Sequence, residues 1–462
     1  MHNERQLSSR SWGPVGAPAV GSLAAGRLSD SATLGNQVTN WGWFADIPAI
    51  SGNWRLASVR LGRQMRALAV AFIPLLAACS NTVAHHARAD LMPMVIDGHS
   101  DFAIHYLRRG WEVQAHDIGT SLPGQSDVPR WRAGGVNGAL VTVGTDLPPG
   151  SSSHFPRVLE SLAWFDALIA RNPDALVAAH SADDFERAEK LGKIALMPAI
   201  EGGDQIDGSL ENLKMAFAAG IRSMGIVYDH HNAIGDGAMA MPGSAGIAAR
   251  TSNGLTPLGR EVIREMNRLG MIVDLSHAAE TTAVEAMRLS SAPVIFSHSG
   301  ARALANTPRN LSDAALHMVA ETGGLVMIPL VPYLTTSEHW NWWMAGETRY
   351  AELAAQHGDD EAAIERGMLE WDAANPQPLV TVRDVADQVE YIAHLAGMDS
   401  VGIGTDFDGM GSFAIPQLAD ASTLPKLLEE LARRGWSQGD LHKLARGNLL
   451  RVLSAVEAVA QH

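Results

Sequence analysis

The chain has 462 residues, 46% hydrophobic and 18% charged, an ordinary balance for a globular protein with a large core and not for a disordered or fibrous chain. Acidic residues outnumber basic ones by 50 to 35, a net charge of -15, which argues against nucleic acid as a partner because phosphate contacts need clustered Lys and Arg. The single cysteine excludes a disulfide framework and a cysteine-rich metal site, so any metal must be held by carboxylates and some of the 18 histidines.

The N-terminal part of the chain has the composition of a leader and not of a folded domain. Residues 1–64 are rich in Gly, Ser, Ala and Arg without a clear period, and we interpret them as a non-structural extension. Residues 65–78 are predicted to be a lipoprotein-type signal segment, because arginines precede an apolar run that ends in Leu-Ala-Ala before Cys79. This run is too short to span a bilayer comfortably.

Cys79 resembles the lipidated N-terminal residue that remains when a bacterial lipoprotein signal is cleaved. We therefore expect an exported protein of the cell envelope whose only membrane attachment is a lipid on Cys79, followed by a linker over residues 79–93. A cysteine that occurs by chance in a short buried helix is the alternative explanation of this pattern.

From residue 94 onward, short apolar runs alternate with amphipathic helical stretches. Most of the runs are continuously apolar, as strands buried on both faces are. They lie at Met94–Asp97, Gly138–Val143, Ile194–Ile200, Ser223–Val227, Met271–Leu275, Val294–Ser297, Leu325–Leu330 and Val401–Gly404. Eight such units predict a closed parallel barrel or a doubly wound sheet, and the count of eight favours an α/β fold of the (β/α)8 TIM-barrel type over residues 94–462.

The connection between the seventh and eighth predicted strands is far longer than usual, which predicts a helical insertion over about 331–380. It contains Trp340-Asn341-Trp342-Trp343. Loops that follow barrel strands line the active face, so this segment could form a lid or the contact of a homodimer. A satellite hydrophobic cluster under a long loop explains the tryptophans equally well.

Polar residues gather where the predicted strands end, and a barrel brings these ends together on the face where barrel enzymes place their chemistry. These residues are His99 and Asp101 after strand one, Glu201 after strand three, Tyr228 after strand four, His277 after strand five, His298 after strand six, and Asp406 and Asp408 after strand eight. A single histidine in such a place is more often a hydrogen-bonded core residue than a ligand. The occurrence of all of them at one predicted face indicates a site.

Three histidines and two carboxylates without a thiolate suit zinc or another divalent first-row metal. They are too many for one tetrahedral catalytic ion with an open position, and they suffice for two ions if Glu201 bridges. His99 and Asp101 would then hold one ion, and His277 and His298 the other. A water between two such ions loses a proton near neutral pH and becomes a nucleophile.

The chain resembles the renal (membrane) dipeptidase family of zinc metallopeptidases over nearly all of residues 94–455. The matching stretches are Ile96–Asp101, Ala199–Gly203, Tyr228–Gly237, Thr256–Gly259, Val273–His277, Ser297–Leu304, Arg309–Asp313 and Gly402–Gly409. The resemblance implies a barrel of the metal-dependent hydrolase type with two Zn²⁺ per chain. The implied metal ligands are His99, Asp101, Glu201, His277 and His298, with Glu201 bridging.

The resemblance also implies roles for residues that are not metal ligands. Arg309 would hold the free carboxylate of the substrate, which suits the two-point geometry of a guanidinium. Asp406 would pass a proton from the attacking water to the leaving amine, whereas Asp408 would support the site. Tyr228 stands where well-known mammalian members have a substrate-contacting histidine, so we expect it to bind substrate; His230 or His231 could supply an imidazole instead.

The sequence therefore predicts a zinc-dependent dipeptidase in which a metal-bridging hydroxide attacks the peptide bond, with dipeptides as substrates, including some with a C-terminal D-residue. Another binuclear amidohydrolase, acting on N-acyl-amino acids or lactones, would have the same metals and barrel. A non-catalytic binding lipoprotein of the envelope is the alternative from a different class.

Overall fold

The computed structural model describes residues 92–104, 117–144, 153–239, 253–358, 360–410 and 413–461. The predictions about the extension at 1–64, the signal segment at 65–78 and the lipidation of Cys79 lie outside the described residues. The predicted linker at 79–93 lies outside them too, except for its last two residues.

Eight parallel strands follow one another around a nearly closed barrel, which confirms the predicted fold. In spatial order they are β1 (Val95–Ser100), β2 (Val136–Gly144), β4 (Ile194–Ile200), β5 (Ser223–Gly225), β6 (Ile272–Asp274), β7 (Ile295–Phe296), β8 (Leu325–Ile328) and β9 (Val401–Ile403). The chain after β9 returns to β1: Asp101 N donates to Phe407 O at 2.9 Å, and Asp406 N donates to His99 O at 3.1 Å. These two bonds join the carboxyl ends of the first and last strands.

A further short strand, β3 (Leu176–Ala178), was not predicted. It pairs in parallel with the first half of β4, whereas β5 pairs with the last two residues of the same strand. Three residues are too few for a periodic pattern to show in the sequence. Strand β1 also extends beyond its predicted end at Asp97, so His99 lies within the strand.

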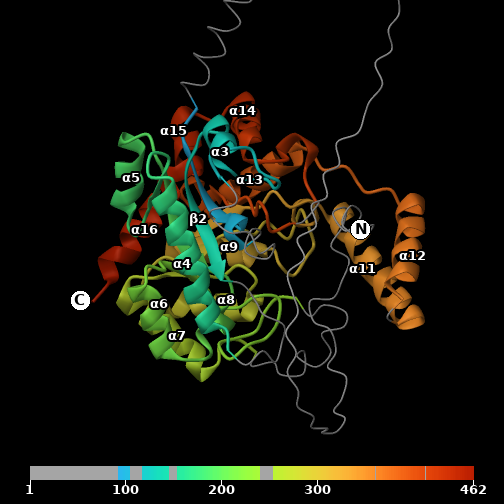
Figure 1. Cartoon of the computed structure of the whole chain (residues 1–462), viewed down its shortest axis with the longest axis horizontal. Coiled ribbons are helices and arrows are strands. Elements are labelled where there is room, and N and C mark those ends of the chain that lie inside the picture. Colours follow the sequence, from blue (N-terminus) through green and yellow to red (C-terminus); the bar gives the residue numbers. More distant parts are fainter. Residues whose placement is uncertain are drawn as a thin grey trace, which may run out of the picture. The chain divides into compact units, whose positions relative to one another are not determined.

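Helices surround the strands, as Figure 1 shows for α4 to α9 in green and yellow and for α13 to α16 in orange and red. They are α3 (Val128–Ala133), α4 (Phe155–Arg171), α5 (Ala182–Lys190), α6 (Leu210–Ala218), α7 (Pro257–Leu269), α8 (Glu280–Leu289), α9 (Asp313–Thr322), α13 (Val382–Ala396), α14 (Pro425–Arg433), α15 (Gln438–His442) and α16 (Asn448–Val459). The predicted ends of α7 are confirmed: Thr256 Oγ1 accepts from Gly259 N at 2.9 Å, and Gly270 adopts the left-handed conformation that favours glycine, with φ 78°.

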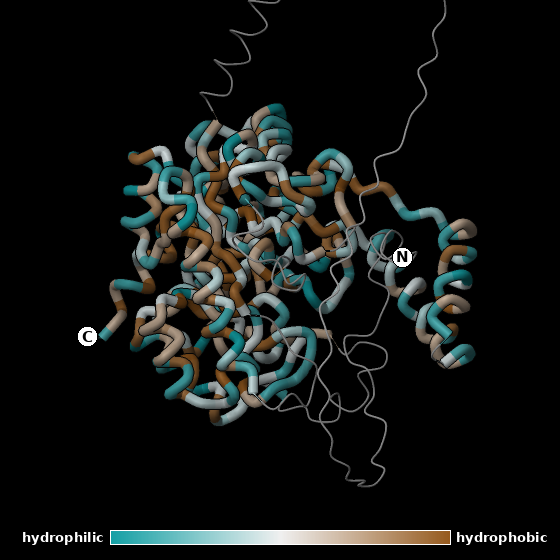
Figure 2. The backbone as a smooth tube through the Cα atoms, in the orientation of Figure 1, coloured by the Kyte–Doolittle hydropathy of each residue, from teal (hydrophilic) through white to brown (hydrophobic). Residues whose placement is uncertain are grey.

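The barrel interior is apolar below the carboxyl ends of the strands. Buried side chains from six strands, with those of α16, form one cluster there: Ile96, Leu140, Met197, Ile272, Ile295, Met327, Leu449 and Leu453. A larger cluster packs the outer faces of the strands against the helices. Figure 2 accordingly shows hydrophobic stretches concentrated inside the ring of helices. Because the interior below is filled by side chains, the polar residues of the strand ends are confined to one end of the barrel.

The predicted insertion consists of α10 (Pro332–Thr335), α11 (Ser337–His357) and α12 (Glu361–Ala374). Trp340, Trp342 and Trp343 are buried and form a hydrophobic cluster with Met239 and Phe413, and the partly buried Trp371 of α12 packs against it. This arrangement matches the satellite-cluster interpretation. Within the residues that the structure describes, no helix has the length and apolar character needed to cross a membrane.

Candidate functional site

The five predicted metal ligands meet at the carboxyl end of the barrel, and Glu201 lies at their centre. Its Oε1 is 3.4 Å from His99 Nε2, 3.1 Å from His277 Nε2 and 3.4 Å from His298 Nε2. Asp101 Oδ1 is 3.6 Å from His99 Nε2. All five side chains belong to buried residues. The structure therefore brings together all five residues that the sequence predicts to be metal ligands, and the Glu201 carboxylate lies close to all three histidines.

The hydrogen bonds of His277 and His298 fix which ring nitrogen carries the proton. His277 Nδ1 lies 2.7 Å from a carboxylate oxygen of Asp229, so Nδ1 donates. His298 Nδ1 lies 2.9 Å from Ser297 Oγ, and that hydroxyl donates to Asp274 Oδ2 at 2.5 Å. Ser297 Oγ must therefore accept from His298. Both Nε2 atoms are left with lone pairs.

These two lone pairs face each other, because the Nε2 atoms are only 2.8 Å apart. Burial, and next the positive charge of Arg309, lowers the pKa of His277 to about 4. Burial also lowers the pKa values of His99 and His298. The rings are thus neutral at pH 7. Their nitrogen lone pairs lie close to one another and to the carboxylate oxygens, with no hydrogen between them. Such a set of atoms repels itself unless a cation lies among them, so the residues fit divalent metal ions.

Two buried atoms at the centre support the same conclusion. Among the described residues, His99 Nε2 and Asp101 Oδ1 are buried without a hydrogen-bond partner. Buried polar atoms rarely lack a partner unless they bind a ligand. His99, Glu201 and His298 form one group whose ligand atoms lie within 4.8 Å of one another, and His99, Asp101 and Asp406 form a second. The two groups share His99 and lie side by side.

The backbone at two of these residues is strained. His277 has φ 69° and Asp406 has φ 60°, in the left-handed region that side chains with a Cβ rarely adopt. Each strained residue is held by a backbone bond: Ala238 N donates to His277 O at 2.6 Å, and Asp406 N donates to His99 O. Strain of this kind, of order 1–3 kcal/mol per residue, persists where the surrounding structure imposes it and is concentrated at functional sites.

Asp97 ties the first ligand to the last strand. Its carboxylate accepts from Thr405 N at 2.8 Å and from Thr405 Oγ1 at 2.6 Å, and it also accepts from the backbone N–H of His99. Asp97 therefore fixes the end of β1, which carries His99, against the segment that carries Asp406.

Asp406 lies at the edge of the cluster, with Oδ1 3.9 Å from His99 Nε2. Burial, and next the negative charge of Asp101, raises its pKa above the ordinary value of an aspartate. A carboxylate with a raised pKa is a better proton acceptor. Asp408 instead accepts from Gln125 N at 2.6 Å, and its own N–H donates to Gln125 Oε1 at 2.9 Å. These bonds anchor the loop after β9, as a supporting residue would.

Arg309 is buried, with 6% of its surface exposed, and its Nη1 is a buried atom without a hydrogen-bond partner among the described residues. Its charge lowers the pKa values of His277 and Asp229, so the guanidinium lies within electrostatic range of the ligand cluster. A buried cation is costly unless it is paired. The arrangement suits an anionic ligand that arrives beside the histidines.

Tyr228 stacks on His277, with ring centroids 4.3 Å apart and the planes 25° from parallel. It therefore lies directly against a ligand of the predicted metal site. The neighbouring histidines have other partners: His230 Nε2 lies 3.2 Å from Asp204, and His231 Nδ1 lies 3.2 Å from Asp236.

Asp229, Asp274 and Ser297 orient two of the predicted ligand histidines, a role that the sequence alone did not predict. Asp229 follows Tyr228 at the end of a strand, and this position was the only indication in the sequence that it could belong to the site. The contact with His277 spans 48 residues of sequence, so no local spacing could reveal it.

Comparisons with known proteins agree with this geometry. The family described as "Membrane dipeptidase (Peptidase family M19)" matches residues 86–462. The chain is 33% identical to Dipeptidase aclJ of Aspergillus oryzae over 381 residues, which cover 79% of this chain and 78% of that protein. It is 32% identical to Dipeptidase tcpJ of Claviceps purpurea over 375 residues, which cover 79% and 77%.

A solved metallopeptidase from Rhodobacter sphaeroides, liganded with a phosphinate mimic of the dipeptide L-Ala-D-Ala, has the same fold. The TM-score is 0.63 at 23% identity, and the likeness covers 79% of this chain and 99% of that one.

Proposed function

Because the chain belongs to the membrane dipeptidase family of metallopeptidases and is thus a peptide-bond hydrolase, we propose that it is a dipeptidase with two Zn²⁺ bridged by Glu201. The convergence of three neutral imidazoles on the Glu201 carboxylate carries this proposal. His99 and Asp101 would hold one ion, and His277 and His298 would hold the other. When bound, the ions would supply polarisation of the scissile carbonyl and a lower pKa for the attacking water.

Arg309 confines the substrate to short peptides with a free C-terminus. Its buried Nη1 donor, unpaired among the described residues, is available to a carboxylate, and a guanidinium binds a carboxylate through two parallel hydrogen bonds. A longer peptide has no carboxylate at this distance from the scissile bond. It therefore leaves the arginine buried without a counterion.

Asp406 moves the proton. It takes a proton from the attacking water and delivers it to the leaving amine nitrogen, and its raised pKa makes the first of these transfers easier. Tyr228, stacked on His277, faces the substrate from the side of the fourth barrel strand in sequence order. Its hydroxyl donates a hydrogen bond to the developing oxyanion.

The stereochemistry of the substrate and the location of the protein are further parts of the proposal. The phosphinate complex of the Rhodobacter sphaeroides protein makes L-Ala-D-Ala a suitable test substrate, and we propose that D-residues are accepted at the C-terminal side. From the sequence pattern before Cys79 we propose a cell-envelope lipoprotein. Mass spectrometry of natively expressed protein should find a lipid on Cys79; an unmodified chain that retains residues 65–78 would contradict this.

The test combines metal analysis with hydrolysis of L-Ala-L-Ala and L-Ala-D-Ala by the full chain, before and after chelation. We expect two metal ions per chain and cleavage that chelation abolishes. Two ions without cleavage of either dipeptide would shift the assignment to a hydrolase of N-acyl-amino acids or lactones. Peptide binding by metal-free protein without cleavage would support a binding lipoprotein.

Arg309→Met separates a dipeptidase from the other hydrolases that the same metals could serve. We expect roughly 10²-fold lower kcat/KM on free dipeptides, because the substrate carboxylate loses its buried partner. Hydrolysis of the corresponding dipeptide amide should change much less. Arg268→Met is a matched control, since Arg268 is an exposed arginine whose partner is Glu265, 2.8 Å away on α7.

A further inference from the structure

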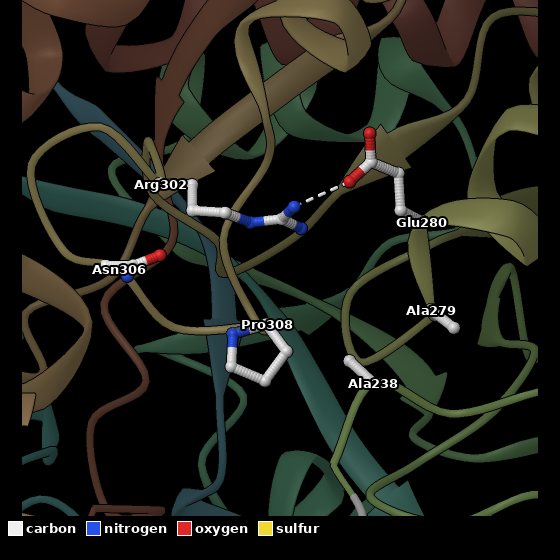
Figure 3. A pocket seen from close by; sticks show the side chains of 6 residues that line it. All are labelled: Ala238, Ala279, Glu280, Arg302, Asn306 and Pro308. Carbon is white, nitrogen blue, oxygen red and sulfur yellow. Dashed lines mark hydrogen bonds and ion pairs between the residues drawn. The ribbon is translucent and has the colours of Figure 1, made fainter.

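A cavity of about 360 Å³ lies beside the proposed substrate site. Figure 3 shows the six residues that line it, with the Arg302 guanidinium extended across the space toward Glu280. The remaining walls are small or short side chains: Ala238, Ala279, Asn306 and Pro308. The proposed reaction assigns no role to any of them.

The chain connects this cavity to the site at three points. Pro308 directly precedes Arg309, and Ala279 follows His277 by two residues. Ala238 N donates to the backbone oxygen of His277 at 2.6 Å. A smaller cavity next to it is lined by Arg309 as well as by Glu280, Arg302 and Pro308. The cavity therefore adjoins both the metal-ligand loop and the arginine that holds the substrate carboxylate.

Among the described polar groups that line the cavity, the carboxylate acceptors already have hydrogen-bond partners, whereas one guanidinium donor does not. Glu280 uses both carboxylate oxygens, since Oε2 accepts from Arg302 Nη1 at 2.6 Å and Oε1 accepts from Ser312 Oγ at 2.6 Å. Arg302 Nε donates to Asn310 O at 3.1 Å. Arg302 Nη2 has no recorded hydrogen bond within the described part of the chain, and Figure 3 shows it turned into the cavity.

Two bonds hold the Arg302 side chain in place before any ligand arrives. A guanidinium fixed at Nε and Nη1 loses little further rotamer freedom when Nη2 binds a ligand. Its side chain is 29% exposed, so the remaining donor is reachable from the cavity. The negative charge of Glu280 offsets that of Arg302. The cavity therefore offers a directed hydrogen-bond donor more than a net charge.

We propose that this cavity receives the side chain of the substrate's C-terminal residue, and that Arg302 selects side chains carrying a carbonyl oxygen: the carboxamides of Asn and Gln, and the carboxylates of Asp and Glu. The proposal rests on the proposed function, in which Arg309 holds the α-carboxylate next to this cavity. Ala238, Ala279 and Pro308 leave room for such side chains, and Arg302 supplies the hydrogen bond that an aliphatic side chain of the same shape lacks.

The test compares kcat/KM for L-Ala-L-Asn, L-Ala-L-Asp and L-Ala-L-Leu, because Leu has nearly the shape of Asn without its polar atoms. The parent protein should prefer Asn and Asp over Leu. Arg302→Met retains most of the length of the side chain and removes the donor. We expect the Asn-to-Leu ratio to fall roughly 10-fold, mainly through a higher KM for Ala-Asn, since one hydrogen bond to a charged donor is lost. Arg268→Met should leave the ratio unchanged.

The outcomes separate this proposal from the proposed function. If the parent cleaves all three dipeptides and Arg302→Met leaves the ratio unchanged, the cavity does not select the side chain, although the dipeptidase stands. If the parent binds two metals but cleaves none of these three dipeptides, nor L-Ala-L-Ala or L-Ala-D-Ala, the proposed function itself fails.

Ala279→Leu provides a second test that does not disturb the Arg302–Glu280 pair, in case the first variant does not fold. It fills the cavity from the opposite wall and should lower kcat/KM for Ala-Asn more than for Ala-Gly. Equal losses on both substrates would contradict the placement of the side chain in this cavity.

Discussion

The metal-ligand cluster and the tryptophan cluster of the helical insertion are both buried, but they are stabilised in opposite ways. In the insertion, Trp342 lies against Trp371 and Phe413, and its Nε1 donates to Asn375 O at 2.8 Å, so packing and hydrogen bonding favour the same conformation. In the cluster, neutral imidazoles and carboxylates crowd one another around Glu201, and the backbone at His277 and Asp406 is strained. The first region is organised for stability, and the second is held in place by its surroundings for a ligand.

The sharpest test of this difference is Glu201→Gln. Removing the central charge should lower metal content and reduce dipeptide kcat/KM on the order of 10³-fold, about 4 kcal/mol of barrier, because both of the proposed ions would lose a ligand. The metal-free variant should unfold at the same denaturant concentration as the chelated parent or at a higher one, since it relieves crowding among the ligands. A chelated variant markedly less stable than the chelated parent would show that Glu201 also stabilises the barrel.

Trp342→Ala should show the reverse pattern. Loss of a buried tryptophan side chain together with its hydrogen bond costs about 3–5 kcal/mol. Unfolding followed by tryptophan fluorescence should show the insertion melting earlier, while metal content per folded chain stays at the parent value. Loss of metal from protein that is still folded would mean that the insertion also holds the site together.

Asp229→Asn tests whether the residues behind the ligands matter as much as the ligands themselves. Burial alone would raise the pKa of Asp229, but its contact with His277 lowers it, so the carboxylate is charged and orients the imidazole. An amide can present its NH₂ group to Nδ1 and favour the wrong tautomer. We expect metal affinity to fall about 10–100-fold, measured by competition with a chromogenic chelator. An unchanged affinity would mean that backbone geometry alone orients the ring.

The barrel and the clustering of the predicted ligands could be predicted from the sequence because both depend on local features. Buried parallel strands are continuously apolar, and His99 and Asp101 are two residues apart on an extended segment, so both reach one end of the barrel. The burial of Arg309 and the pairing of His277 with Asp229 depend on contacts far apart in the chain, and no pattern of residues reports those. Strand β3 could not be predicted, because it pairs with β4 through the surrounding structure and has no periodic sequence pattern of its own.

The smallest expected effect concerns Glu347, a buried carboxylate on α11 that stands as an exception within the insertion. It has no recorded hydrogen bond or ion pair within the described residues, and burial raises its pKa to about 7 from 4.5. Because its folded-state pKa lies above the unfolded one, Glu347 costs no stability below pH 4.5, and its contribution becomes destabilising as the pH rises through 7. Glu347→Gln should therefore be about 1–3 kcal/mol more stable than the parent at pH 8 and nearly equal to it at pH 4.5. Chemical denaturation at the two pH values, with metal chelated in both proteins, measures the difference. A stability gain of the same size at both pH values would show that the amide improves packing, whereas a loss at pH 8 would show that the charged carboxylate has a stabilising partner.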